Sequence, residues 1–331
     1  MVRIQIDDNS KQLISFFILT FLISWSIWFI APLIFYGDST SLVYFCGIGN
    51  FGPSLSAIII ASRINSDKVK NSKKRLWITF SIIFLVGLIS AFAGLINYPD
   101  FTVITIIIIF ILSLIPSFMI SGLYASNSGI SELLKTVKGI KKKKSFLSYA
   151  WGIPLLATIG AVIIYIILGG YIPPTTNIII IFVYLTASFP FSIVFVPVGE
   201  EIGWRGFATP RLLEKRSPLI TGLIIGVIWS IWHAPLHFIG IIGDGLPGLL
   251  LRFTYNIPFG IIFTWYYNKS HSNLLGAIIL HASLNVYASI VMFSLDLNVY
   301  STIIYIIFTI IIILHGEMWK SLPITEEFRN H

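Results

Sequence analysis

The sequence consists mainly of apolar runs of about 20 residues, the length that an α-helix needs to cross the hydrocarbon core of a bilayer. Hydrophobic residues make up 56% of the 331 residues and charged residues only 11%, against about 45–50% and 25% in soluble domains. The chain is therefore predicted to be an all-α, polytopic membrane protein, with about 8–10 transmembrane helices around an intramembrane polar cavity.

Candidate spans can be placed along the whole chain. They cover roughly residues 12–36, 41–62, 76–97, 102–123, 147–168, 176–198, 217–236, 247–267, 273–293 and 300–316. The eighth is the weakest, because it contains Arg252 and Asn256. In the second, Phe51-Gly52-Pro53-Ser54 is expected to mark a kink or a close helix contact. We expect N-terminal transmembrane helices with basic loops over residues 1–146, a core over 147–320 and a tail over 321–331.

The connectors between these spans alternate in charge. Every second connector carries Lys or Arg, as in the run Lys141 to Lys144, and the connectors of the other parity contain neither. Because basic loops stay on the cytoplasmic side, both termini and the connector Gly199–Gly206 are predicted to be cytoplasmic in a multi-pass cell-membrane protein. The net charge of +8 then reflects topology, so we expect membrane lipids and no nucleic acid as partners.

The polar residues of the C-terminal half form three clusters, each tied to a different span: Glu200, Glu201 and Arg205; His233 and His237; and His281 and Asn285. Ionisable residues in membrane segments are costly and are interpreted as functional. Polar side chains of apolar helices turn towards the bundle interior, because lipid offers them no partner. We therefore expect the three clusters to converge, with Glu201 and Arg205 paired at helical spacing.

The residue types narrow the chemistry. A glutamate with histidines, and no serine or cysteine nucleophile motif, suits activation of water, while Asn and His can stabilise an oxyanion. Glu200, His233 and His281 could also hold zinc or iron, although no HExxH motif occurs. We favour no permanently bound metal and leave zinc open. The single cysteine, Cys46, excludes an intrachain disulfide and a multi-cysteine metal site.

The motifs EExxxR, WHxPL and HxxxN, in this order between about Phe191 and Tyr287, resemble the CPBP family of CAAX prenyl proteases and bacteriocin-processing proteins, also called Abi. The resemblance implies that Glu200 is the general base that activates water and that His233 helps to hold this water. It also implies that His281 and Asn285 stabilise the oxyanion.

The same resemblance makes Glu201 and Arg205 a supporting pair. The chain departs from the usual pattern at Trp229, where phenylalanine is common, and at His237, where an aromatic residue is common. Pro235 lies between the two histidines and disturbs helix geometry, so the role of His237 stays open.

In function, the resemblance implies an intramembrane endopeptidase that cleaves a membrane-anchored peptide or lipidated protein near the cytoplasmic face. The substrate would be of CAAX type or bacteriocin type. A non-catalytic self-immunity or scaffolding protein of the same family is the alternative. A transporter that uses the buried acids as a proton relay is a third class of function.

Overall fold

The computed structural model of the chain describes residues 9–64, 73–95, 102–121, 128–135, 146–171, 189, 196–291 and 295–321. The elements in these residues are all helical: α1 (Asn9–Ile34), α2 (Ser39–Gly49), α3 (Gly52–Ile64), α4 (Lys73–Leu95), α5 (Val103–Ser121), α6 (Ser128–Lys135), α7 (Phe146–Ile167), α9 (Pro197–Gly203), the π-helix η2 (Trp204–Ala208), α10 (Thr209–Leu213), α11 (Pro218–Trp232), α12 (Ala234–Phe238), α13 (Gly245–Lys269), α14 (Leu274–Val291) and α15 (Leu295–Gly316). Their bounds follow the predicted spans closely. Most of the predicted span 176–198, the run 141–144 and nearly all of the tail 321–331 lie outside the described residues.

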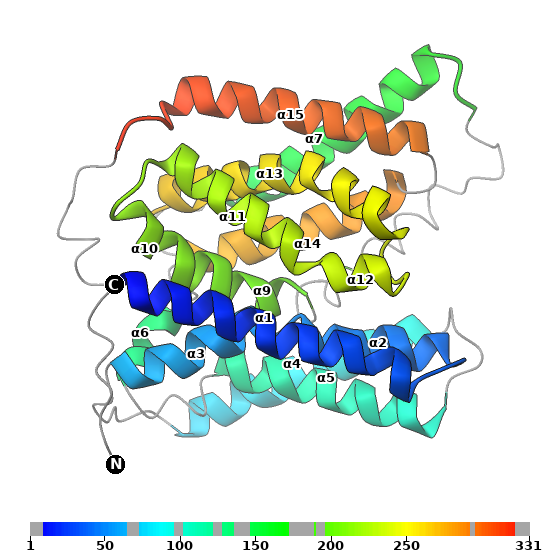
Figure 1. The fold of residues 1–331 in the computed structure, drawn as a ribbon, viewed down its shortest axis with the longest axis vertical. Helices are drawn as coiled ribbons and strands as arrows, with labels where there is room; N and C mark the ends of the chain where they lie inside the picture. Colours follow the sequence, from blue (N-terminus) through cyan, green and yellow to red (C-terminus); the bar gives the residue numbers. More distant parts are fainter. Residues whose placement is uncertain are drawn as a thin grey trace.

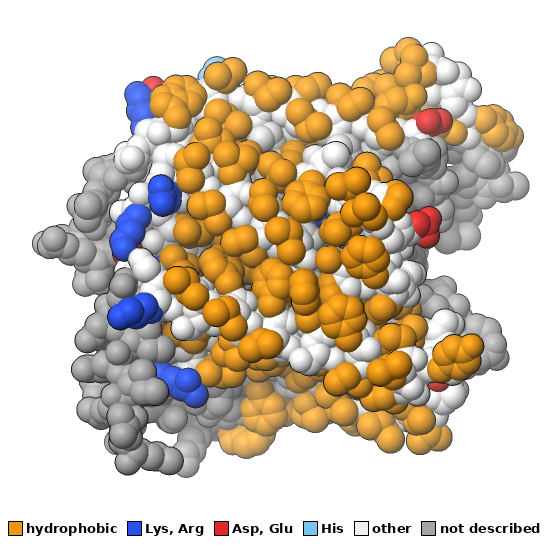
Figure 2. Space-filling model, in the orientation of Figure 1, with side chains coloured by type: hydrophobic (Ala, Val, Ile, Leu, Met, Phe, Trp, Pro, Cys, Tyr) orange, Lys and Arg blue, Asp and Glu red, His pale blue; other side chains and the backbone are white. Residues whose placement is uncertain are grey.

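The helices run side by side, as expected for a polytopic membrane protein (Figure 1). In the described part of the chain, six segments are long and apolar enough to cross a bilayer, and three shorter apolar helices accompany them. Isoleucine, leucine and phenylalanine side chains cover the face seen in Figure 2. A membrane-spanning helix can expose such residues because its surroundings are lipid, and its backbone polar groups are satisfied within the helix. The predicted all-α membrane fold is confirmed.

One end of the bundle gathers the start of α1, the α10–α11 connection and the end of α15. The Lys215 ammonium donates to the Ser10 hydroxyl at 3.0 Å, and the Leu219 N–H donates to the Met318 carbonyl at 2.9 Å. Lys and Arg side chains gather at this end in Figure 2, next to a few acidic ones, whereas the opposite end shows Asp and Glu side chains without Lys or Arg. This separation fits the charge pattern of the loops. The cytoplasmic location of the basic end stays a prediction.

The antiparallel helices α11 and α13 approach each other closely through glycines. A Cβ atom built on Gly226 would lie 2.7 Å from the Ile257 Cα, and one on Gly222 would lie 2.7 Å from the Ile261 Cα. On the facing helix, a Cβ on Gly260 would lie 2.4 Å from the Gly222 carbonyl oxygen. Small residues are a common means of close helix packing in membranes. Here they fix the register between the two helices.

The helix α9, which carries the EE motif, rests on the break between α2 and α3. A Cβ on Gly199 would lie 2.6 Å from the Asn50 carbonyl oxygen, and one on Gly203 would lie 2.5 Å from the Pro53 backbone. The Ser54 hydroxyl donates to the Val198 carbonyl at 2.7 Å. The expected kink and close contact at residues 51–54 are thus both present. Gly199 and Gly203, on either side of the two glutamates, allow α9 to pack this closely on the α2–α3 break. We call this contact the seat of α9.

The segment after α9 widens into the π-helix η2, in which the Thr209 N–H bonds the Trp204 carbonyl five residues back. Proline in the next position, Pro210, lacks a backbone N–H, and an inserted proline is a common cause of a disturbed helix ladder. Such π-turns are frequent at functional sites. Helix α9 contacts α3 and α14, and η2 contacts α3, α6, α13 and α14. The motif segment therefore joins the N-terminal helices to the C-terminal ones.

Candidate active site

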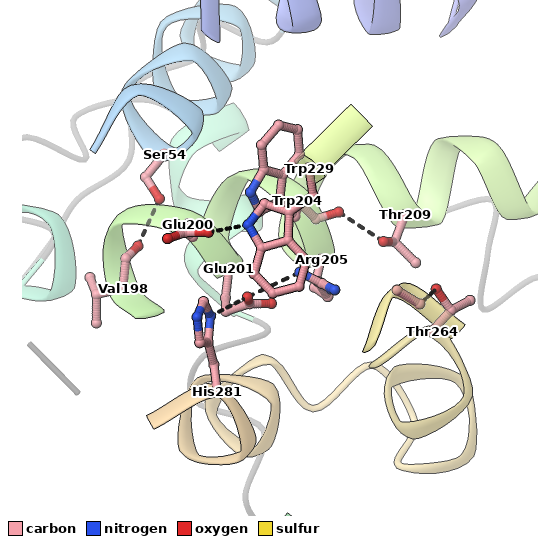
Figure 3. Close-up of polar contacts among 11 residues, drawn as sticks. Ser54, Val198, Glu200, Glu201, Trp204, Arg205, Thr209, Trp229, Thr264 and His281 are labelled. Carbon is pink, nitrogen blue, oxygen red and sulfur yellow. Dashed lines mark hydrogen bonds and ion pairs between the residues drawn. The ribbon is translucent and has the colours of Figure 1, made fainter. Parts of the chain in front are cut away.

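The Glu200 carboxylate is enclosed by protein and fixed by a single aromatic donor. Its residue is 1% exposed, and the Trp229 indole N–H of α11 donates to its Oε2 at 2.6 Å (Figure 3). Within the described ranges no basic side chain forms an ion pair with it. A carboxylate that is oriented but not neutralised by a cation remains free to accept a proton, as a general base must.

Glu201 connects two other members of the site. Its Oε1 accepts from the Arg205 guanidinium at 3.0 Å and from His281 Nδ1 at 2.7 Å, and Figure 3 shows both side chains converging on it. The expected pairing of Glu201 and Arg205 is confirmed. The bond between His281 and Glu201 fixes the orientation of the His281 ring and leaves Nε2 as the ring nitrogen that can meet a substrate.

Arg205 is fully buried, and aromatic rings compensate part of its charge. Its guanidinium carbon lies 4.1 Å from the Phe263 ring centroid and 5.0 Å from that of Trp229. Cation–π contacts of this kind are worth about 2 kcal/mol when desolvated. The two rings pack on the face of the Arg205 guanidinium. Its Nε and Nη2 atoms have no hydrogen-bond partner in the described structure.

His233 lies where α11 ends, and its Nδ1 donates to the Trp229 carbonyl at 2.8 Å. This bond leaves Nε2 of a neutral ring as an acceptor, which suits binding of a water molecule. The Trp229 ring contacts both histidines, with centroid distances of 6.1 Å to His233 and 5.3 Å to His281. Glu200, His233 and His281, from three separate elements, therefore surround one indole.

The site lies deep in the bundle. Measured from Pro218 at the basic end, Trp229 is about 16 Å along α11 at 1.5 Å per residue. That is about half of a 30 Å hydrocarbon core. The position of the site relative to the cytoplasmic face stays a prediction.

Two other predicted residues stand apart from this group. Asn285 lies one turn beyond His281 on α14 and is exposed, with no hydrogen bond to the other members. His237 lies on α12, separated from His233 by the helix break before Pro235. It accepts a hydrogen bond from the Arg252 Nε at 2.9 Å.

The residues proposed for a metal do not form a metal-binding group. Among the described residues, no three His, Cys, Asp or Glu side chains are arranged to hold an ion. Nδ1 of His233 and Nδ1 of His281 are already directed to a carbonyl and to Glu201. We therefore derive no step through a metal.

Sequence reasoning missed Trp229 and Arg252. For Trp229 the sequence showed only a departure from the common phenylalanine, although an indole N–H, which phenylalanine lacks, can donate to a carboxylate. Arg252 was treated only as a weakness of the eighth span, although a cation inside a membrane is a functional candidate by default. The indole N–H of Trp229 and the charge of Arg252 were both visible in the sequence.

Comparisons with known proteins agree with these motifs. The family described as Type II CAAX prenyl endopeptidase Rce1-like matches residues 181–287, which include α9, α11 and most of α14. The protein "CAAX prenyl protease 2" of Methanococcus maripaludis is 26% identical over 220 residues, which cover 60% of this chain and 81% of that protein. Both matches support the resemblance of the three motifs to the CPBP family.

The CPBP relatives support peptidase activity in the membrane. The matched region runs from residue 181 to residue 287 and therefore contains each of the three motifs. The N-terminal helices α1 to α6 lie outside it, yet α3 provides the seat of α9. The proposed boundary between an N-terminal part and a CPBP core at residues 146–147 stays a prediction.

We expect Trp229→Phe to lower kcat about tenfold, because it keeps the ring but removes the hydrogen bond to Glu200. Hydrogen bonds to charged groups are worth about 1.5–3 kcal/mol. Trp232→Phe is the matched control: it lies on the same helix and is fully buried, and its indole N–H has no partner in the described structure. Equal activity of the two variants would contradict a role for the indole N–H.

Proposed function

We propose that this chain is an intramembrane endopeptidase in which Glu200 activates the attacking water. The observation that supports this best is a buried carboxylate held by Trp229 at 2.6 Å, without an ion-pair partner in the described residues. The imidazoles of His233 and His281 both contact the ring of the same tryptophan. Such a group can take a proton from water in the transition state. A base held in position before the reaction contributes further through proximity.

In the proposed reaction, Glu200 removes a proton from water as the oxygen attacks the scissile carbonyl carbon. Nε2 of His233 accepts a hydrogen bond from the O–H group that stays on this water. Nε2 of His281 donates to the oxyanion. Asn285, which makes no hydrogen bond with the described site residues, is the second donor that the family resemblance implies. Glu200 then returns the proton to the leaving nitrogen as the C–N bond breaks. The products are a carboxylic acid and an amine, which exchange the remaining proton to become a carboxylate and an ammonium group.

The substrate is proposed to be a membrane-anchored or lipidated peptide of CAAX type or bacteriocin type. Support comes from an apolar groove of about 560 Å³ along α1, lined by residues that include Phe21, Trp25 and Phe29. The Trp25 indole donates to the Trp232 carbonyl at 2.9 Å, directly before His233. A lipid chain lying in this groove would bring an attached peptide close to the candidate site.

Isotope labelling tests the proposal directly. We expect purified protein in detergent, incubated in H₂¹⁸O with a panel of lipidated and unlipidated peptides, to cleave at least one of them. The new carboxyl group should carry one ¹⁸O atom after a single turnover, read by mass spectrometry. Products without the label would contradict direct attack by water. A parallel Glu200→Ala sample identifies cleavage by contaminating proteases.

A further inference from the structure

A second cation lies close to the candidate site, and the reaction proposed above does not use it. Arg252 is on α13, inside a segment that is apolar enough to span the membrane. Among the described residues no carboxylate forms an ion pair with it. A charge at such a depth in a membrane is energetically costly. An arginine that stays unneutralised there calls for a ligand of opposite charge.

Neutral groups hold this arginine in place. Its Nε donates to Nε2 of His237 at 2.9 Å, and its guanidinium carbon is 5.4 Å from the Tyr255 ring centroid. His237 is itself only 2% exposed, and its Nδ1 has no partner in the described structure. A Cβ atom on either Gly243 or Gly248 would lie 2.8 Å from that Nδ1. These glycines enclose the imidazole, which fixes the guanidinium.

The terminal N–H groups of the Arg252 guanidinium, which do not contact His237, remain available to a ligand. Its two terminal nitrogens make no hydrogen bond or ion pair with the described residues, and the side chain is partly exposed. Two parallel N–H groups on one side of a guanidinium match the two oxygens of a carboxylate. An ammonium or a neutral amide cannot offer this geometry.

The helix register places Arg252 beside the candidate catalytic residues. Gly226 packs against Ile257 and Gly222 against Ile261, so Arg252 falls at the level of Ile231, between Trp229 and His233. Two residues along a helix correspond to about 3 Å. Arg252 is also within range of charge–charge interaction with Glu200 and His233.

We propose that Arg252 binds the C-terminal carboxylate of the peptide substrate, so that cleavage occurs a few residues before a free C-terminus. The inference rests on the proposed peptidase function and gives it a specificity residue. In this arrangement His237 is a positioning residue, since it acts by directing the guanidinium. An internal peptide segment has no carboxylate to satisfy Arg252 and is a poor substrate.

Paired substrates test this assignment. Each peptide that the wild type cleaves is synthesised with a C-terminal carboxylate and with a C-terminal carboxamide. We expect amidation to lower kcat/KM about 10- to 100-fold in the wild type, the value of a lost charge-assisted hydrogen bond, mainly through KM. Arg252→Gln should show the same loss on the carboxylate peptide and cleave the carboxamide peptide as the wild type does.

Cleavage of the carboxamide peptide by Arg252→Gln at the wild-type rate also shows that this variant is folded. Arg252→Lys keeps the charge without the paired N–H groups and should retain part of the discrimination. If amidation of the peptide lowers kcat/KM of the Arg252→Gln variant by the same factor as in the wild type, Arg252 does not bind the carboxylate and the assignment is overturned. Equal cleavage of both peptides by the wild type overturns it too, and in that case the peptidase function still stands.

Discussion

Glu200→Gln lowers kcat by about 10²–10⁴-fold, the contribution expected of a general base. Glutamine has the same shape, and its amide oxygen can still accept the Trp229 hydrogen bond. The substitution therefore removes proton acceptance with little change in packing. Initial rates on a peptide identified by isotope labelling measure the effect, and thermal unfolding in detergent monitors the fold.

Glu214→Gln is the control for this experiment. Glu214 lies at the end of α10, is exposed and accepts a hydrogen bond from Asn9. Its substitution should leave both rate and stability unchanged. A Glu200→Gln variant that keeps more than about a tenth of wild-type activity would refute the assignment of Glu200 as the base.

Glu201→Met is expected to be the most destabilising single substitution in the site. Both Glu201 and Arg205 are fully buried, and breaking a buried ion pair from one side costs about 3–5 kcal/mol. The variant leaves the Arg205 charge without its partner and His281 without its acceptor. A large fall in melting temperature, together with loss of activity, is the expected result.

The double variant Glu201→Met, Arg205→Met separates structure from catalysis. Replacing both members of a buried pair by apolar residues is often neutral or stabilising, so the melting temperature should recover. Activity should not recover, because Nδ1 of His281 still lacks the carboxylate that orients its ring. Recovery of both would show that Glu201 serves only to neutralise Arg205.

The sequence was sufficient for the features that depend on local rules. The predicted spans lie close to the described helices because about 20 apolar residues are needed to cross a bilayer. Glu201 and Arg205 pair as expected because residues four apart share a helix face, and the bond of 3.0 Å forms although a π-helix begins at Trp204.

Features that depend on tertiary packing could not be found in this way. No spacing rule brings Trp229 to Glu200, since the two lie on different helices. The bond between His237 and Arg252 likewise depends on the α11–α13 register and on the turn that ends at Gly245. Asn285 lies one turn from His281 as expected, yet its side chain is exposed and makes no hydrogen bond with the described site residues.

The seat of α9 on the α2–α3 break has a consequence for protein engineering. Gly199 and Gly203 touch the backbone of Asn50 and Pro53, so the two glutamates take their position from a part of the chain about 150 residues earlier. A shortened protein that begins at α7 would keep all three motifs and still lose the surface that sets their spacing. Grafting the motifs onto another scaffold would require transplanting this helix junction with them.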